Sequence, residues 1–139
     1  MAYSARREPL RIIVDSNALF APLLFKIDIF GELERLVNRR FDLVLLSPVK
    51  RELETLAKKG SHQMRKNAGY ALGLAEKLKY VEIADDSIAR TDDVIVEIAA
   101  VWKAPVFTND VQLKKRLRDI SVPVIYVRQK SHLEIDGLI

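Results

Sequence analysis

The sequence predicts an α/β domain built on a five-stranded, mostly parallel sheet. Short runs of branched apolar residues recur along the chain, and each is followed by residues with the apolar spacing of an amphipathic helix. Strands that are apolar on both faces and alternate with helices are typical of parallel sheets with helices on both sides. The 139 residues suffice for a single domain. We place its core at about residues 10–128, with short tails at both ends.

The predicted strands share branched or aromatic apolar residues and end at polar or turn-forming residues. They are Arg11–Val14, Leu43–Leu46, Tyr80–Ile83, Pro105–Phe107 and Val122–Val127. Asp15 follows the first strand directly, and open α/β sheets bind ligands beyond the carboxyl ends of their strands. An aspartate at this position can also do no more than form the turn.

Helices are predicted between these strands from apolar spacing and end signals. They are Ala18–Phe25, Asp28–Asn38, Ser47–Lys59, a long helix after Ser61, Thr91–Trp102 and Val111–Arg118. We expect Ser47, Ser61 and Thr91 to cap their helices, and Gly60 to end the third. Pro48 fits the first turn after Ser47.

Composition excludes several classes of protein. The absence of cysteine rules out disulfides, zinc ribbons and thiol nucleophiles, and the two histidines lie far apart. No Gly-rich phosphate loop follows a strand, which disfavours NTPases and dinucleotide enzymes. No apolar run approaches the ~18 residues of a membrane span, so we expect a cytoplasmic protein. The net charge of +4 favours a polyanionic partner, although a generic basic surface would have the same charge.

Carboxylates recur near the carboxyl ends of the predicted strands. Asp15 ends the first strand, Glu52 lies about one turn into the helix after the second, Asp92 and Asp93 open the helix after the third, and Asp110 follows the fourth. Taken singly, each has an ordinary explanation as a helix-end charge or a solvated side chain. Gathered at one sheet edge they would repel one another unless a cation neutralised them.

An all-oxygen cluster suits a hard ion, Mg²⁺ or Mn²⁺, of the kind that promotes phosphodiester cleavage. An Asp-dependent phosphatase or a receiver domain is an alternative from another class. The first needs an Asp-x-Asp pair, which Asp15-Ser16-Asn17 does not provide, and the second needs a phosphate-accepting aspartate after the third strand and a downstream lysine, a poor fit here.

Four motifs resemble those of the PIN-domain nucleases, and they occur in the family's order over about Arg11 to Val127. They are Val14–Asn17, Val49–Leu53, Thr91–Asp93 and Thr108–Asp110. The chain is most similar to the single-domain archaeal and eukaryotic PIN proteins related to ribosomal-RNA processing, through Thr91–Asp93, Leu113–Leu117 and Pro123–Tyr126. Toxins of the VapC type share the four acids.

The resemblance implies a three-layer α/β/α fold with strand order 3-2-1-4-5, a Mg²⁺ or Mn²⁺ ion, and hydrolysis of single-stranded RNA. By motif, Asp15, Asp93 and Asp110 would be metal ligands, and Glu52 would orient or deprotonate the attacking water. Helical spacing favours Asp92 toward the sheet, whereas the family motif points to Asp93, which we adopt as the expectation.

The resemblance also suggests supporting and substrate-binding residues. Asn17 and Thr108 would hold the carboxylates in place. Near the same edge, the basic residues predicted to contact RNA phosphates are Lys50, Arg51, Lys114 and Lys115. Besides RNA, the expected partners are a second copy of the chain, an antitoxin or a ribosome-assembly factor. The alternative within the family is an RNA-binding scaffold with an idle site, against which the intact acidic set counts.

Overall fold

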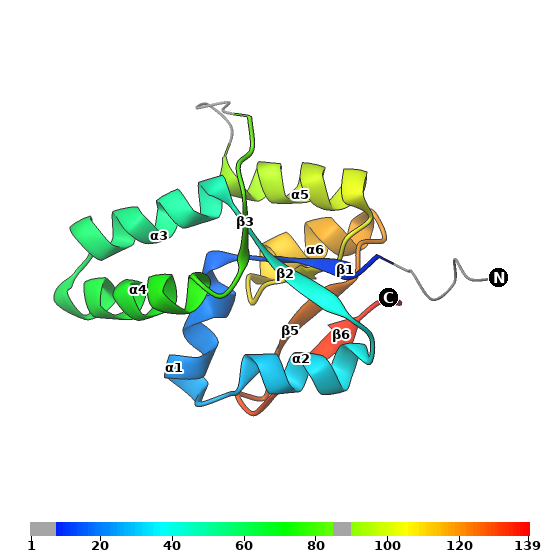
Figure 1. Cartoon of the computed structure of the whole chain (residues 1–139), viewed down its shortest axis with the longest axis horizontal. Helices are drawn as coiled ribbons and strands as arrows, with labels where there is room; N and C mark the ends of the chain where they lie inside the picture. Colours follow the sequence, from blue (N-terminus) through cyan, green and yellow to red (C-terminus); the bar gives the residue numbers. More distant parts are fainter. Residues whose placement is uncertain (1–7, 85–89) are drawn as a thin grey trace.

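A single mixed sheet forms the centre of the computed structural model, which describes residues 8–84 and 90–139. Its six strands within these residues are β1 Leu10–Val14, β2 Phe41–Leu46, β3 Lys79–Val81, β4 Val106–Phe107, β5 Val124–Arg128 and β6 His132–Asp136. They are ordered β3-β2-β1-β4-β5-β6 (Figure 1). The predicted order of the first five strands is confirmed, and all four of their pairings are parallel.

The prediction of five strands is wrong by one, because the expected C-terminal tail contains β6. This strand pairs antiparallel with β5 and buries Leu133 completely. The chain reverses through Gln129 and Lys130, which have φ angles of 54° and 57°. Tight hairpin turns need positive φ and usually place Gly or Asn there. Since neither residue occurs here, the sequence shows no turn signal.

The helical segments follow the predicted alternation. They are η2 Ser16–Phe20, α1 Ala21–Phe25, α2 Ile29–Val37, α3 Ser47–Lys59, α4 His62–Ala75, α5 Thr91–Trp102 and α6 Val111–Asp119. The first predicted helix is thus a 3₁₀ turn followed by a short α-helix, and Gly60 ends α3 as expected. In the part of the chain that the structure describes, no helix has both the length and the apolar content to cross a membrane.

Only one of the three predicted serine and threonine caps is found. The Ser61 hydroxyl accepts a hydrogen bond from the Met64 backbone N–H at 3.2 Å. Ser47 and Thr91 are instead the first residues of α3 and α5, and neither helix has a side-chain cap bond. The Ser47 hydroxyl accepts from the backbone N–H of Ile83 at 2.9 Å, which ties the end of β3 to the start of α3.

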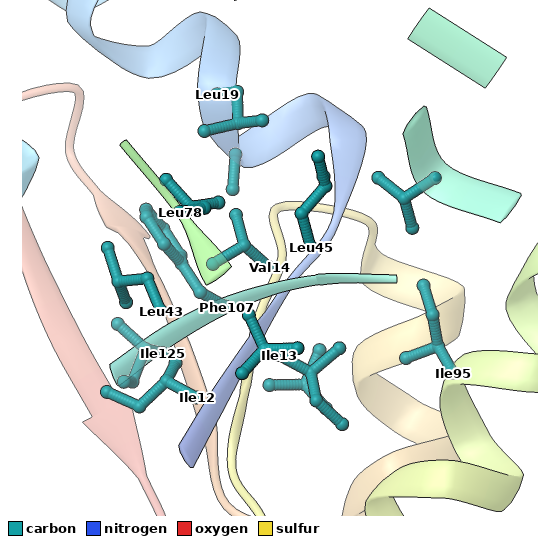
Figure 2. Close-up of a cluster of buried hydrophobic side chains, with 14 of the residues drawn as sticks. Ile12, Ile13, Val14, Leu19, Leu43, Leu45, Leu78, Ile95, Phe107 and Ile125 are labelled. Carbon is teal, nitrogen blue, oxygen red and sulfur yellow. The ribbon is translucent and has the colours of Figure 1, made fainter. Parts of the chain in front are cut away.

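Helices cover both faces of the sheet, and the core fixes its central strand. Ile12, Ile13 and Val14 of β1 are fully buried. Figure 2 shows Ile13 directed toward Ile95 of α5, and Val14 directed toward Leu19 of η2. Each large aliphatic side chain buried in this way contributes about 1.5–3 kcal/mol. The position of the strand, and therefore of Asp15 after it, is set by contacts on both faces.

The topology gathers several chain segments at one edge of the sheet. β1 and β4 pair in parallel with Val14 opposite Phe107, so the residues that follow them emerge side by side. The Asp15 N–H donates to the Phe107 carbonyl at 2.9 Å, which extends the pairing to the site. α3 contacts both η2 and α5, and α5 contacts α6. In Figure 1 the starts of α3 and α5 lie next to each other above this edge.

Candidate active site

A polar pocket of about 250 Å³ opens at the carboxyl edge of the sheet. It lies among the start of η2, the second turn of α3 and the N-terminal ends of α5 and α6. Its lining residues are Asp15, Ser16, Asn17, Glu52, Arg90, Thr91, Asp92 and Asp110. Three of the four predicted acids, Asp15, Glu52 and Asp110, therefore share one pocket, although 95 positions separate the first from the last.

Asp15 is the most buried of these acids, with 4% of its surface exposed. Its Oδ1 accepts from the Ser16 N–H at 2.8 Å, and its Oδ2 accepts from the Thr108 hydroxyl at 2.7 Å and from the Asn17 amide at 3.2 Å. The pKa of Asp15 is raised to about 6, chiefly by burial and in part by the negative charges of Glu52 and Asp92, whereas the hydrogen bonds from Thr108 and Ser16 lower it. Hydrogen bonds thus fix the carboxyl group, but burial makes its charge costly.

Asn17 and Thr108, which were predicted to hold the carboxylates, both donate hydrogen bonds to Asp15. The Thr108 hydroxyl donates to Asp15 and accepts from the Asp110 N–H at 3.1 Å. The Asn17 Oδ1 accepts from the Asn109 N–H at 2.9 Å, so its side chain bridges the ends of β1 and β4. Sequence reasoning missed Asn109, whose Oδ1 accepts from the Val127 N–H at 2.8 Å. Only its place between Thr108 and Asp110 pointed to it, because an asparagine after a strand usually indicates a turn.

Asp110 has two local roles at once. It is the N-cap of α6, and its Oδ1 accepts from the N–H groups of Gln112 and Leu113 at 2.8 and 3.1 Å. In the described residues no hydrogen bond reaches its Oδ2, and the side chain lines the pocket. The helix-end explanation for this aspartate is therefore correct, and it leaves one carboxylate oxygen for a ligand.

Glu52 projects into the pocket from the second turn of α3. Its Oε1 accepts a short hydrogen bond of 2.6 Å from the Ser16 hydroxyl. Ser16 therefore contacts both acids, through its backbone to Asp15 and through its side chain to Glu52. Sequence reasoning did not select Ser16, because a serine after a strand-ending aspartate looks like an ordinary turn residue.

The acidic doublet differs from the motif-based expectation. Asp92 is half-buried and lines the pocket. Asp93 lies outside it, with a side chain 52% exposed and an ion pair of 2.9 Å between its Oδ1 and Nη2 of Arg116. Consecutive helical residues point about 100° apart, so the two cannot both face the sheet edge. The structure brings Asp92 to the other acids, which is the placement that helical spacing favoured.

Mutual repulsion also acts on Asp92. Its pKa is raised by burial first and then by the charges of Asp110 and Glu52, while Arg116 and Arg90 lower it. Two acids of the pocket, Asp92 and Asp15, thus have raised pKa values, and both are raised in part by neighbouring carboxylates. Such a pocket favours a bound cation, which would offset the repulsion.

The carboxylates of the pocket suit a hard ion that keeps several of its waters better than an ion that is coordinated by protein groups alone. Among residues 8–84 and 90–139, no group of three or more Asp, Glu, His or Cys side chains is already arranged to hold a metal ion. Magnesium typically binds proteins through one or two carboxylates and keeps several waters. The four carboxylates of the lining, the volume of about 250 Å³ and the Oδ2 of Asp110, which no described residue hydrogen-bonds, fit that mode of binding.

The two lysines predicted to contact RNA from α6 have different surroundings. The Lys114 ammonium lies 3.6 Å from the centre of the Tyr126 ring and 3.5 Å from Oδ2 of Asp136. It is therefore packed between α6 and the β5–β6 hairpin. Lys115 is exposed, with no ion pair or ring contact to any other described residue.

The basic residues of α3 are also partly engaged. The Lys50 ammonium lies 5.0 Å from the centre of the exposed Tyr80 ring, and Arg51 is 4.0 Å from a carboxylate oxygen of Glu82. Arg51 and Glu82 side chains are 54% and 69% exposed, so this pair is weak and open to exchange. One cation that sequence reasoning missed, Arg90, lines the pocket itself.

Comparisons with known proteins agree with this architecture. A family model described as "PIN like domain" matches residues 12–130. The chain is 35% identical to Ribonuclease VapC4 of Methanocaldococcus jannaschii over 93% of its own length and 98% of that protein. It is 29% identical to Ribonuclease VapC9 of Archaeoglobus fulgidus over 91% and 89% of the two chains.

Solved structures add two similarities. The PIN domain endonuclease Utp24 superposes with a TM-score of 0.79 and 27% identity over 94% of both chains. A chain of VapBC2 from Rickettsia felis, solved with a promoter DNA fragment, gives a TM-score of 0.57 over 77% of this chain and 92% of its own. At 18% identity the latter shows the fold alone. The family match, the 35% identical relative and the shared fold agree, and the chain belongs to the PIN-like domain family.

Proposed function

We propose that the protein is a metal-dependent endoribonuclease that hydrolyses phosphodiester bonds in single-stranded RNA with Mg²⁺ or Mn²⁺. The observation that carries the proposal is that Asp15, Glu52, Asp92 and Asp110 line the same polar pocket. The relatives named as ribonucleases and the similarity to a PIN endonuclease support the same chemistry.

In this proposal Asp15, Asp92 and Asp110 would hold the ion, directly or through water. A bound divalent ion lowers the pKa of a coordinated water and stabilises charge on the reacting oxygens of a phosphodiester. Thr108 and Asn17 keep the Asp15 carboxylate oriented toward the pocket. We assign to Asp92 the part that the motif gave to Asp93, because only Asp92 lines the pocket.

Glu52 would orient the attacking water and accept its proton. Hydrolysis forms a bond from the water oxygen to phosphorus and breaks one phosphorus–ribose oxygen bond. Glu52 suits this part because its Oε1 is held by Ser16, while its exposed side chain lines the pocket. A general base must reach the proton that it takes, and a fixed carboxylate meets that condition.

Substrate binding would use cations around this edge. Arg90 lines the pocket, and the exposed side chains of Arg51 and Lys115 lie on the helices that border it. Lys50 and Lys114 would contribute less because each is stacked on a tyrosine ring. Phosphates of a single strand are bound mainly by such charges, which makes affinity depend on salt.

The relatives named Ribonuclease VapC4 and VapC9 support a role of the VapC type. For that role we propose an antitoxin as the protein partner and the cytoplasm as the location. The similarity to the PIN domain endonuclease Utp24 over nearly the whole chain supports an endonuclease. As the second candidate role we propose RNA processing, with a ribosome-assembly partner. A second copy of the chain is a further candidate partner. Both roles require the same hydrolysis at the same pocket.

Cleavage of end-labelled single-stranded RNA tests the proposal directly. Wild-type protein should cleave with Mg²⁺ or Mn²⁺ and lose activity when EDTA is added, and Asp15→Asn should be inactive. The matched control is Asp42→Asn, which removes a carboxylate at the start of β2, on the opposite edge, where it pairs with Lys79 at 2.9 Å. EDTA-resistant cleavage, or equal activity of Asp15→Asn and wild type, would contradict the proposal.

A further inference from the structure

We infer that Ser16 is a positioning residue that holds Glu52 in the orientation needed to handle the attacking water. The inference rests on the proposed function and adds a residue to it. Ser16 follows β1 as the first residue of η2, lines the pocket and is 8% exposed. Its hydroxyl donates to Oε1 of Glu52 at 2.6 Å, across 36 positions of sequence.

Glu52 has no other restraint in the described part of the chain. The Ser16 hydroxyl is its one hydrogen-bond donor there, and no described cation forms an ion pair with it. Its neighbours one turn away on α3 include Pro48, Val49, Thr55 and Leu56, none of them basic. Since a free glutamate side chain samples many rotamers, one short hydrogen bond decides where this carboxylate points.

The contact also gives the two carboxylate oxygens of Glu52 different roles. A distance of 2.6 Å lies in the range of hydrogen bonds between a hydroxyl and an ionised carboxylate. The single hydroxyl proton of Ser16 is used at Oε1, which leaves Oε2 for a water in the pocket. A carboxylate held at one oxygen and open at the other has the arrangement that a water-orienting group needs.

A purely structural role for Ser16 can be separated from this one. Its backbone N–H, not its side chain, donates to Oδ1 of Asp15 at 2.8 Å. Alanine at this position keeps that bond and the 3₁₀ turn, and removes only the hydroxyl contact to Glu52. Ser16→Ala is therefore a selective probe, and Ser16→Thr restores the hydroxyl.

The test compares Ser16→Ala, Ser16→Thr, Glu52→Gln and the double variant Ser16→Ala/Glu52→Gln in RNA cleavage with saturating metal ion. Ser16→Ala should lower kcat by about 10- to 100-fold, the usual effect of removing a group that orients a functional residue. KM and the RNA affinity measured by anisotropy should stay at wild-type values, and Ser16→Thr should recover most of kcat. In the Glu52→Gln background, Ser16→Ala should cause no further loss.

Ser131→Ala is the matched control, because it removes a serine hydroxyl from the exposed β5–β6 turn and should leave kcat unchanged. Circular dichroism melts establish that each variant is folded at the assay temperature. Wild-type kcat in Ser16→Ala, or an equal loss in the Glu52→Gln background, overturns the inference. Wild-type protein that cleaves no RNA with any metal ion overturns the proposed function instead, so the two failures are distinguishable.

Discussion

Replacing Asp15 by asparagine should make the metal-free protein more stable at neutral pH while removing its activity. The reason is the burial of this carboxyl group, which is 4% exposed and surrounded by other acids. Burial raises its pKa from the ordinary 3.8 to about 6. At 1.36 kcal/mol per pH unit, keeping Asp15 ionised costs about 3 kcal/mol of folding free energy at pH 7.

The amide recovers most, but not all, of that cost. Asn17 and Thr108 both donate hydrogen bonds to Oδ2 of Asp15, and an amide nitrogen at that place cannot accept them. The mismatch should cost about 1 kcal/mol. The expected net gain is about 2 kcal/mol at pH 7, which corresponds to a rise in Tm of several degrees for a chain of this size.

The gain should depend on pH in a direction set by the pKa shift. Because the folded-state pKa of Asp15 lies above its ordinary value, the folded protein binds the proton more readily than the unfolded chain. The cost in the wild type is therefore complete above about pH 6 and disappears as the pH falls toward 4. Near pH 4 only the hydrogen-bond mismatch remains, and the variant should be the less stable protein by about 1 kcal/mol.

Urea unfolding of both proteins in EDTA, at intervals from pH 4 to pH 8, measures this crossover. Asp42→Asn is the control, since its exposed ion pair with Lys79 predicts a small and nearly constant difference. A difference between Asp15→Asn and wild type that stays constant with pH would show that the charge of Asp15 is not what destabilises the fold. A variant that is less stable at every pH would refute the reasoning as well.

Three further outcomes are expected. Saturating Mg²⁺ or Mn²⁺ at 100 times Kd should stabilise the wild type by about 2.7 kcal/mol in thermal melts, and an equal rise in Asp15→Asn would place the ion elsewhere. Asp92→Asn should reduce RNA cleavage more than about 100-fold whereas Asp93→Asn should retain it, and the opposite ranking would restore the motif-based assignment. Lys115→Gln should reduce the slope of log RNA affinity against log salt concentration by about 0.7, as measured by anisotropy titrations. Lys114→Gln should instead lower Tm in thermal melts, because its ammonium packs on the Tyr126 ring.

The sequence was sufficient to predict the centre of the fold and most of the acids around the pocket. Apolar strands that end at Asp15 and just before Asp110 define both positions, since parallel neighbours bring their carboxyl ends to one edge. Glu52 required one more assumption, that α3 turns its second-turn side chain back over the edge. The pocket contains that side chain, so the assumption agrees with the structure.

For the acidic doublet Asp92-Asp93, helical spacing and the family motif indicated different residues for the pocket. Ile95 and Ala99 form the buried face of α5, and Asp92 precedes Ile95 by three positions, so it lies on the same face. Asp93 is four positions before the exposed Glu97 and lies with it on the outer side. The orientation of Asp92 toward the pocket therefore agrees with helical periodicity, whereas the family motif pointed to Asp93.

The hydrogen bonds of Ser16 and Ser47 are features that local sequence patterns cannot predict. Ser16 and Ser47 each follow a strand and precede a helical turn, and this position suggests a turn or an N-cap. In the structure each instead makes a hydrogen bond across 36 positions, Ser16 to Glu52 and Ser47 to the backbone of Ile83. A hydroxyl is short and can bond to its own turn or to a neighbouring element with similar geometry. Which of the two occurs depends on whether another polar group lies within reach, and that is decided by the packing of α3 against η2 and by the path of the chain after β3.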